Sequence, residues 1–93
     1  MANIVGYKAV NATAAVTPAS VTPFAQGNAK KIVFIANDDA TNNLWVSLDN
    51  STTESNYLVV LPGEAITDIE IEFNVFWYRS SAATVAFRAL ITK

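Results

Sequence analysis

The chain has 93 residues and a formal net charge of −2, and it contains neither histidine nor cysteine. These absences remove the usual general base, the usual thiolate nucleophile and the commonest ligands for transition metals. They argue against most classes of enzyme, and the acidic balance lacks the basic patch that nucleic-acid binding needs. We therefore expect a single domain without catalytic residues, cofactor, metal or nucleic-acid partner.

Hydrophobic residues make up 52% of the chain and charged residues only 15%, against roughly 25% charged residues in an average soluble domain. A surface with so few charges either stays partly apolar or is covered by a partner. We expect a partner, and the alternative is a monomer whose many small alanines raise its hydropathy. The first residues lack the pattern of a signal peptide, and no apolar run approaches the roughly 20 residues that span a bilayer, so we expect no membrane partner.

The segment before Gly27 is rich in alanine, threonine, serine and proline. Within it, VTPA at 16–19 is echoed by VTPF at 21–24. Each proline favours an extended threonine before it and cannot donate a hydrogen bond to a sheet. This pattern predicts either an extended arm that reaches a neighbouring subunit or an edge strand of its own domain. We assign residues 1–29 to an N-terminal strand and this arm, and residues 30–93 to the β-sandwich core of the same domain.

Short strand patterns follow one another after Gly27. Residues 31–36 form a continuous apolar run of the kind that is buried on both faces of a sheet. The sequence Pro62-Gly63 fits a type II turn, with proline at its second position and glycine at its third. Further strands are expected at 43–48, 57–61, 75–79 and 84–92, with polar loops at 37–42 and 49–56.

Two of these segments alternate clearly between polar and apolar side chains. The carboxylates of Asp68, Glu70 and Glu72 are expected on one face of a strand, with the intervening isoleucines and phenylalanine on the other. Residues 84–92 place an apolar side chain at every second position from Val85. Because no segment has helical periodicity, we predict an all-β fold, an antiparallel β-sandwich or jelly-roll-like small barrel with an extended N-terminal arm.

Two polar clusters are candidates for chemistry. The three carboxylates of residues 68–72 provide the residue type that glycosidases use, although like charges on one strand more often mark a solvated face. The loops at 37–39 and 49–50 are rich in oxygen atoms and flank one strand, so they are candidates for binding calcium. They lack the EF-hand pattern, and turn formation by asparagine and aspartate explains the same residues.

The aromatic residues offer a different kind of site. Trp45, Tyr57, Trp77 and Tyr78 are candidates for a platform that stacks on sugar rings, and the alternative is packing in the core and between subunits. Strand alternation places Trp77 on the face opposite its two aromatic neighbours. We expect an interface with other subunits. The candidate interface residues are Val16, Pro18, Val21, Pro23, Phe24, Trp45, Trp77 and Arg79.

Three stretches together carry a family resemblance: KIVFIAN at 31–37, LWVS at 44–47 and LPGE at 61–64, followed by the aromatic strand at 75–79. The chain from Lys30 onwards resembles the small β-sandwich virion proteins of tailed bacteriophages. These serve as capsid decoration, head-fibre or tail accessory subunits. The resemblance thus implies a structural role without catalytic turnover.

The resemblance also implies partners and a location. We expect a homo-oligomer that contacts other capsid or tail proteins, and a final location in the virion after synthesis in the host cytoplasm. The alternative is a carbohydrate-binding or receptor-binding β-sandwich module that holds a glycan on exposed aromatic side chains. The two interpretations differ in whether the tryptophans serve a protein interface or a sugar.

Overall fold

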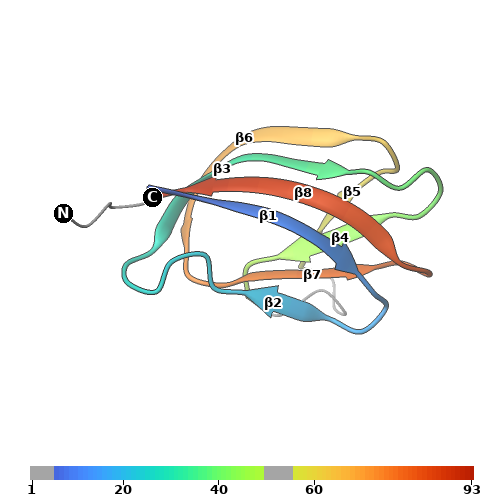
Figure 1. The fold of residues 1–93 in the computed structure, drawn as a ribbon, viewed down its shortest axis with the longest axis horizontal. Coiled ribbons are helices and arrows are strands. Elements are labelled where there is room, and N and C mark those ends of the chain that lie inside the picture. The colour runs from blue at the N-terminus through green and yellow to red at the C-terminus, as the bar shows by residue number, and fades with distance from the viewer. Residues whose placement is uncertain (1–5, 50–55) are drawn as a thin grey trace.

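The computed structural model describes residues 6–49 and 56–93, and this part of the chain consists of strands and loops without a helix. Eight strands are present in it: β1 (Tyr7–Ala14), β2 (Ala19–Val21), β3 (Ala29–Asn37), β4 (Leu44–Ser47), β5 (Leu58–Val60), β6 (Ala65–Phe73), β7 (Phe76–Ser80) and β8 (Val85–Thr92). They form two antiparallel sheets, as Figure 1 shows. The prediction of an all-β fold is confirmed, whereas the jelly-roll alternative stays a prediction.

The two sheets lie over one another with the hydrophobic core between them. The first sheet has the strand order β1-β8-β3-β6 and the second has the order β2-β7-β4-β5. Both sheets contribute fully buried side chains, including Phe87 from β8 and Phe76 from β7. The two rings have their centroids 6.4 Å apart and are tilted by 43°. The molecule is therefore a two-layer sandwich whose layers are joined by aromatic packing.

Strand β8 is the most regular element of the core. Its buried residues occupy every second position, and Arg88 between them is exposed, as the alternation predicts. Because β8 lies between β1 and β3, its core-facing side chains reach both neighbours within the first sheet. The buried residues are Val85, Phe87, Ala89 and Ile91.

In strands β3 and β6, the alternation of buried and exposed side chains is interrupted at one position in each strand. Ile32 and Ile35 of β3 are both buried although they lie three residues apart, because the register with β8 shifts between Ile32 and Phe34. The expectation that residues 31–36 are buried on both faces is therefore wrong, since Val33 and Phe34 are only half-buried. An irregularity of this kind lets a strand keep its apolar side chains on the core side.

The partner strand β6 has a matching irregularity at Asp68, which has a φ of 59°. Aspartate tolerates this left-handed conformation better than most residues. Ile66 and Ile69, on either side of it, both pack against the core and pair with the two buried isoleucines of β3. The expected alternation in residues 68–73 therefore holds beyond Asp68 but breaks at it.

The N-terminal segment is built into the sandwich. Strand β1 pairs with β8 along its whole length, and β2 is an edge strand of the second sheet that pairs with β7. The loop between them is fixed by a hydrogen bond of 2.8 Å that the amide of Ser80 donates to the carbonyl of Ala15. Within the described residues, an edge strand thus replaces the extended arm expected here, because β2 and Phe24 cover the core of their own chain.

The first and last described residues lie at the same end of the sandwich. The amide of Lys93 donates a hydrogen bond of 3.0 Å to the carbonyl of Gly6, which extends the pairing of β1 with β8. Figure 1 shows the start of β1 and the end of β8 on the left, whereas the connections from β3 to β4 and from β5 to β6 lie on the right. Gly6 and Lys93 therefore lie at the opposite end of the long axis from the loops that follow β3 and β5.

Candidate functional site

The outer face of the second sheet carries most of the aromatic candidates. Trp45 of β4 lies directly opposite Arg79 of β7, and Trp77 lies opposite Ser20 of β2 and Ser47 of β4. Trp45, Trp77 and Arg79 are each half-buried, whereas Phe76 on the other face of the same strand is fully buried. We refer to Trp45, Tyr57, Trp77 and Arg79 as the aromatic face.

Trp45 is held between two partners. The ring of Tyr57 stacks on it with centroids 4.8 Å apart and an interplanar angle of 21°. The guanidinium carbon of Arg79 lies 4.4 Å from the centroid of the indole. Since Tyr57 precedes β5 and Arg79 belongs to β7, the partners approach from the two strands that flank β4. Both contacts are favourable, because π systems attract cations and stack at this spacing.

Of the polar groups in this stack, the Nε of Arg79 has a hydrogen-bond partner and the indole N–H of Trp45 has none in the described chain. The Nε of Arg79 donates a hydrogen bond of 3.3 Å to the carbonyl of Ser80. Among the described residues, no carboxylate lies within ion-pair distance of this guanidinium. The indole N–H of Trp45 is buried and has no hydrogen-bond partner there. The Arg79 charge is therefore held in place by a ring and left without a counter-charge in the described chain.

Trp77 has different surroundings from Trp45. Its two cross-strand neighbours are serines, one exposed (Ser20) and one buried (Ser47). No described aromatic ring stacks on it. Of the two tryptophans on the aromatic face, only Trp77 thus has a ring without an aromatic or cationic partner in the described chain.

The remaining interface candidates are divided between surface and core. Val16, in the loop after β1, has 49% of its surface exposed, and Pro18 is half-buried. Val21 packs against the core, and Pro23 and Phe24 are buried. Of these five candidates, only Val16 and Pro18 therefore present apolar surface outside the core of their own chain. The ring of Phe24 lies under the ammonium of Lys93, with 5.2 Å between nitrogen and centroid.

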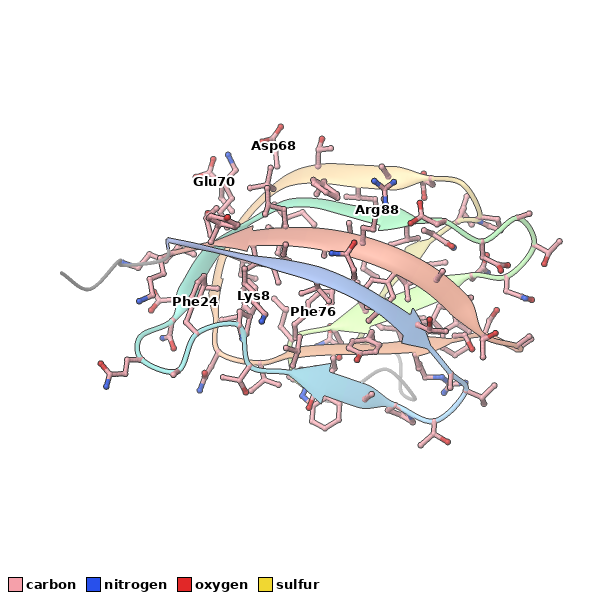
Figure 2. The ribbon with its side chains drawn as sticks, viewed as in Figure 1. Lys8, Phe24, Asp68, Glu70, Phe76 and Arg88 are labelled. Carbon is pink, nitrogen blue, oxygen red and sulfur yellow. The ribbon has the colours of Figure 1, made fainter. Side chains whose placement is uncertain are left out.

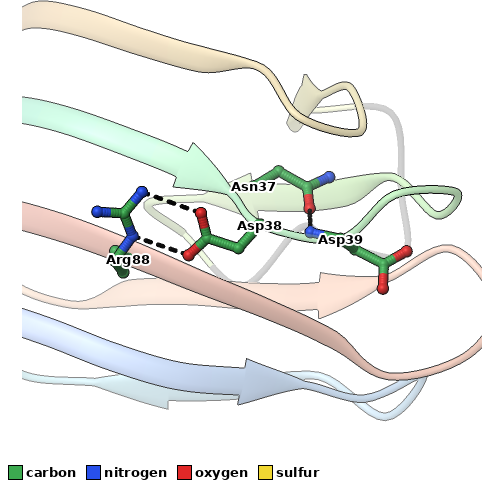
Figure 3. A network of polar contacts seen from close by, with 4 residues as sticks. All are labelled: Asn37, Asp38, Asp39 and Arg88. Carbon is green, nitrogen blue, oxygen red and sulfur yellow. Dashed lines mark hydrogen bonds and ion pairs between the residues drawn. The ribbon is translucent and has the colours of Figure 1, made fainter.

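The loop after β3 is held by its own polar side chains (Figure 3). The Oδ2 of Asp39 accepts hydrogen bonds from the amides of Thr41 at 3.0 Å and Asn42 at 2.7 Å. These donors lower the pKa of Asp39, since hydrogen bonds from Asn42 and Thr41 stabilise the charged form. The loop therefore uses its carboxylate to close a turn.

The neighbouring carboxylate is paired with an arginine of the first sheet. The two oxygens of Asp38 accept hydrogen bonds from the Nε of Arg88 at 2.8 Å and from its Nη2 at 3.0 Å (Figure 3). The side-chain hydrogen bond from Arg88 lowers the pKa of Asp38, and the same contact raises the pKa of Arg88. Each group thus stabilises the charged form of the other.

The calcium interpretation is not favoured by this geometry. The loop at 37–39 precedes β4 and Asp49 follows it, so these described residues lie at opposite ends of that strand and do not meet as expected. Asp49 accepts a hydrogen bond of 2.8 Å from Asn56, and Asn50 lies outside the described residues. The described residues contain no cluster of three acidic side chains that could hold a metal.

A buried asparagine, which the sequence interpretation treated as a loop residue and calcium candidate, organises one end of the sandwich. Asn37 is 2% exposed, and its amide nitrogen donates hydrogen bonds to the carbonyls of Asn42 at 2.9 Å and Val60 at 3.0 Å. Its backbone carbonyl accepts a hydrogen bond from Gly63 at 3.1 Å. The available signal was a polar residue directly after an apolar run, which also fits an ordinary strand end.

Asn37 contacts the expected turn at residues 61–64. There the amide of Glu64 donates a hydrogen bond of 2.9 Å to the carbonyl of Leu61, and Gly63 has a φ of 72°. This is the geometry of the predicted type II turn, which needs a positive φ at its third position. Two of the stretches that carry the family resemblance, 31–37 and 61–64, are therefore in direct contact.

The carboxylates of β6 form an exposed strip on the first sheet. Asp68, Glu70 and Glu72 are all exposed, and Figure 2 shows Asp68 and Glu70 pointing away from the sandwich. Asp68 lies 3.2 Å from the ammonium of Lys31, and Glu72 accepts a hydrogen bond of 2.9 Å from Asn28. These contacts fit a solvated strand better than an enclosed pair of catalytic carboxylates.

A cleft of about 490 Å³ lies between the two sheets at the side where β5 and β6 are the edge strands. It is mostly apolar, and two of its lining residues, Leu58 and Ile71, are 41% and 45% exposed. Asp49 and Asn56, also in its lining, flank residues 50–55, which lie outside the described residues. The other lining residues are Ile32, Ile35, Val46, Ser47, Leu48, Tyr57, Ile69 and Phe76.

Comparisons with protein-family models, with curated proteins and with solved structures found no match for this chain. No helix of the described residues has the length and apolar character needed to cross a membrane. Any functional conclusion therefore depends on the residues of this chain and on the arrangement of their side chains. The aromatic face brings together three of the eight expected interface residues, Trp45, Trp77 and Arg79, on neighbouring strands of one sheet.

Proposed function

We propose that this chain is a non-enzymatic structural protein of a tailed-phage virion, a capsid decoration or accessory subunit that docks on another virion protein through its aromatic face. The observation that carries the proposal is Trp45 in contact with both Tyr57 and Arg79, an arginine that has no counter-charge among the described residues. The resemblance of residues 31–37, 44–47 and 61–64 to small virion proteins supplies the class of assembly.

The residue types of the aromatic face suit a protein interface. Tryptophan, tyrosine and arginine are the residues most enriched among those that dominate binding energy between proteins. Trp45 and Arg79 are fixed by contacts within their own sheet, so little conformational freedom is lost when a partner binds. The partner that fits has a flat apolar patch with a carboxylate or carbonyl oxygen opposite the guanidinium.

A glycan is the alternative ligand for the same face. Sugar binding requires an aromatic ring with a free face, and Tyr57 and Arg79 already contact the ring of Trp45. Trp77, with serine hydroxyls on both neighbouring strands, is the residue on which a sugar would stack. Fluorescence quenching by a glycan that disappears in Trp77→Ala would favour this alternative over protein docking.

The test of docking uses virions of the source phage that are assembled without this chain. Purified protein is added back, and the bound fraction is measured by sedimentation of the particles over a concentration series. We expect saturable binding, weakened about tenfold or more in Arg79→Ala, because a central interface arginine contributes roughly 2 kcal/mol.

The matched control is Arg88→Ala, which removes the same charge from the opposite face of the molecule. We expect this variant to bind like the unmodified chain. Particles that take up no protein would refute the virion role, and equal loss of binding in both arginine variants would refute docking through the aromatic face.

A further inference from the structure

The four edge strands of the sandwich differ in how they resist pairing with another chain. Strands β2 and β5 have only three residues each, and β2 is flanked by Pro18 and Pro23. Strand β6 is longer, but the left-handed Asp68 interrupts it and carboxylates follow along it. Short length, prolines, irregularities and charges are the features that keep sheet edges from associating.

Strand β1 has only one of these features, a single charged residue near its start. It has eight residues, and each of them pairs with β8 in an unbroken register. It contains no proline, and Lys8 is its only charged residue. A long and regular edge of this kind is a template for adding another strand.

The direction of the backbone groups of β1 follows from its first hydrogen bond. The amide of Lys93 donates to the carbonyl of Gly6, so this opposed pair is one that exchanges hydrogen bonds. In an antiparallel ladder such pairs alternate with pairs whose backbone groups point away. The amides and carbonyls that face outward are therefore those of Tyr7, Ala9, Asn11 and Thr13.

Nothing in the described part of the chain pairs with this outer edge. Strand β1 is the last strand of the first sheet, and its only strand partner is β8. Tyr7, Ala9, Asn11 and Thr13 are all exposed. The edge thus presents a regular row of donors and acceptors at one side of the sandwich (Figure 1).

We propose that β1 pairs antiparallel with β1 of a second copy of this chain, joining the two first sheets into one continuous sheet. A register centred on Val10 pairs all four residues of β1 whose backbone groups point outward. It places Ala9 opposite Asn11 and Tyr7 opposite Thr13 of the second copy, so that the outward backbone groups exchange hydrogen bonds. A contact of this kind is self-complementary and closes as a two-fold dimer.

Charge favours β1 over the other long edge as the site of self-pairing. In the proposed register Lys8 lies opposite Ala12 of the second copy, so no like charges face each other. Self-pairing of β6 would instead bring together strands that each carry Asp68, Glu70 and Glu72. Pairing of β1 with β6 of another copy would meet the irregular backbone at Asp68. The dimer uses a different surface from the aromatic face and does not depend on the proposed function.

The first test measures the mass of the full chain by light scattering and analytical ultracentrifugation over a dilution series. We expect a dimer that dissociates on dilution, because pairing of one edge strand buries a modest area. Ala9→Pro removes an outward amide that the pairing with β8 does not use, and we expect it to be monomeric with unchanged far-ultraviolet circular dichroism.

Thr67→Pro is the matched control on β6. Asn37 donates to the carbonyl of the opposed Glu64, so the same alternation places the amide of Thr67 on the outer side of β6. We expect this variant to dimerise like the unmodified chain. A full chain that is monomeric at every concentration, or a dimer lost only in Thr67→Pro, would overturn the proposal.

A second test decides the matter if Ala9→Pro does not fold. The chain has no cysteine, so introduced thiols are its only ones. Ala9→Cys and Asn11→Cys proteins are mixed and oxidised, because directly opposed Cα atoms about 5.5 Å apart allow a disulfide. We expect the mixed disulfide to form in preference to either homodimeric disulfide. Equal cross-linking in all three samples, or none, would contradict the proposed register.

Discussion

The outer faces of the two sheets each present one arginine, and the two arginines are used in different ways. On the first sheet, Arg88 makes two hydrogen bonds to Asp38, so its charge is compensated within the chain. On the second sheet, Arg79 lies against the indole of Trp45 without an acidic partner among the described residues. The difference shows that an aromatic ring can fix the position of an arginine without neutralising its charge, so the charge can still pair with an acidic group of another molecule.

The largest expected loss of stability comes from replacing Asn37, which holds the loop that carries Asp38, the partner of Arg88. Asn37→Ala leaves the buried carbonyl of Val60 without its donor and releases the loop that carries Asp38. We expect a loss of about 3 kcal/mol in the free energy of unfolding, since buried polar groups are left unpaired. Urea denaturation measures it, and Asn42→Ala, which changes a half-buried loop side chain, is the control. A loss no greater than that of the control would show that Asn37 does not hold this end of the sandwich.

Removal of the indole tests the other face. Trp45→Ala deletes the ring that contacts both Tyr57 and Arg79. We expect a destabilisation of about 2 kcal/mol, below the value for a fully buried tryptophan because Trp45 is only half-buried. Thermal and urea unfolding monitor the change, with Trp77→Ala as the matched variant. Equal losses in the two variants would indicate that the stack adds nothing beyond ordinary packing.

The contact between guanidinium and indole is expected to contribute less. Arg79→Ala should lower the free energy of unfolding by about 1 kcal/mol, the size of a partly exposed cation–π contact. Arg79→Lys keeps the charge but loses the flat group that lies on the ring. The stability of this variant should therefore fall between that of the unmodified chain and that of Arg79→Ala. Urea denaturation in low and high salt distinguishes this contact from an ion pair. A strong salt dependence would contradict the assignment.

The smallest effect concerns the ion pair on the first sheet. Because the folded-state pKa of Asp38 is lowered, its contribution to stability is present above the ordinary carboxyl pKa of about 3.9 and is lost as the pH falls through the folded value. We expect the stability difference between the unmodified chain and Asp38→Asn to be small at neutral pH and to disappear in acid. Unfolding measured across this range checks the sign, and a difference that grows in acid would refute it.

The parts of the fold that the sequence predicts are those fixed by local preference. Pro62-Gly63 gives its turn because glycine alone readily supplies the positive φ at that position. Strand β8 alternates as predicted because its core-facing side chains all meet the same interior. In both cases the information lies in neighbouring residues.

Other features depend on partners that are distant in the sequence. The irregularities at Val33 and Asp68 arise where two strands keep isoleucines on the core side, which neither strand specifies alone. The Thr/Pro-rich segment has the same pattern as an arm or as an edge strand, and burial of Phe24 decides between them. The stack on Trp45 likewise needs Tyr57, which approaches from the end of a different strand.

The hydrogen bond between Gly6 and Lys93 holds these two residues side by side at one end of the sandwich. A tag, label or cargo protein joined before Gly6 or after Lys93 would leave from the same pole, on the left in Figure 1. At the opposite pole, the exposed loop tip at Ala40 and Thr41 would remain free for inserted display sequences. Two different payloads joined directly to Gly6 and to Lys93 would start beside each other, because these two residues share a backbone hydrogen bond, so the domain could hold both partners of an engineered fusion close together.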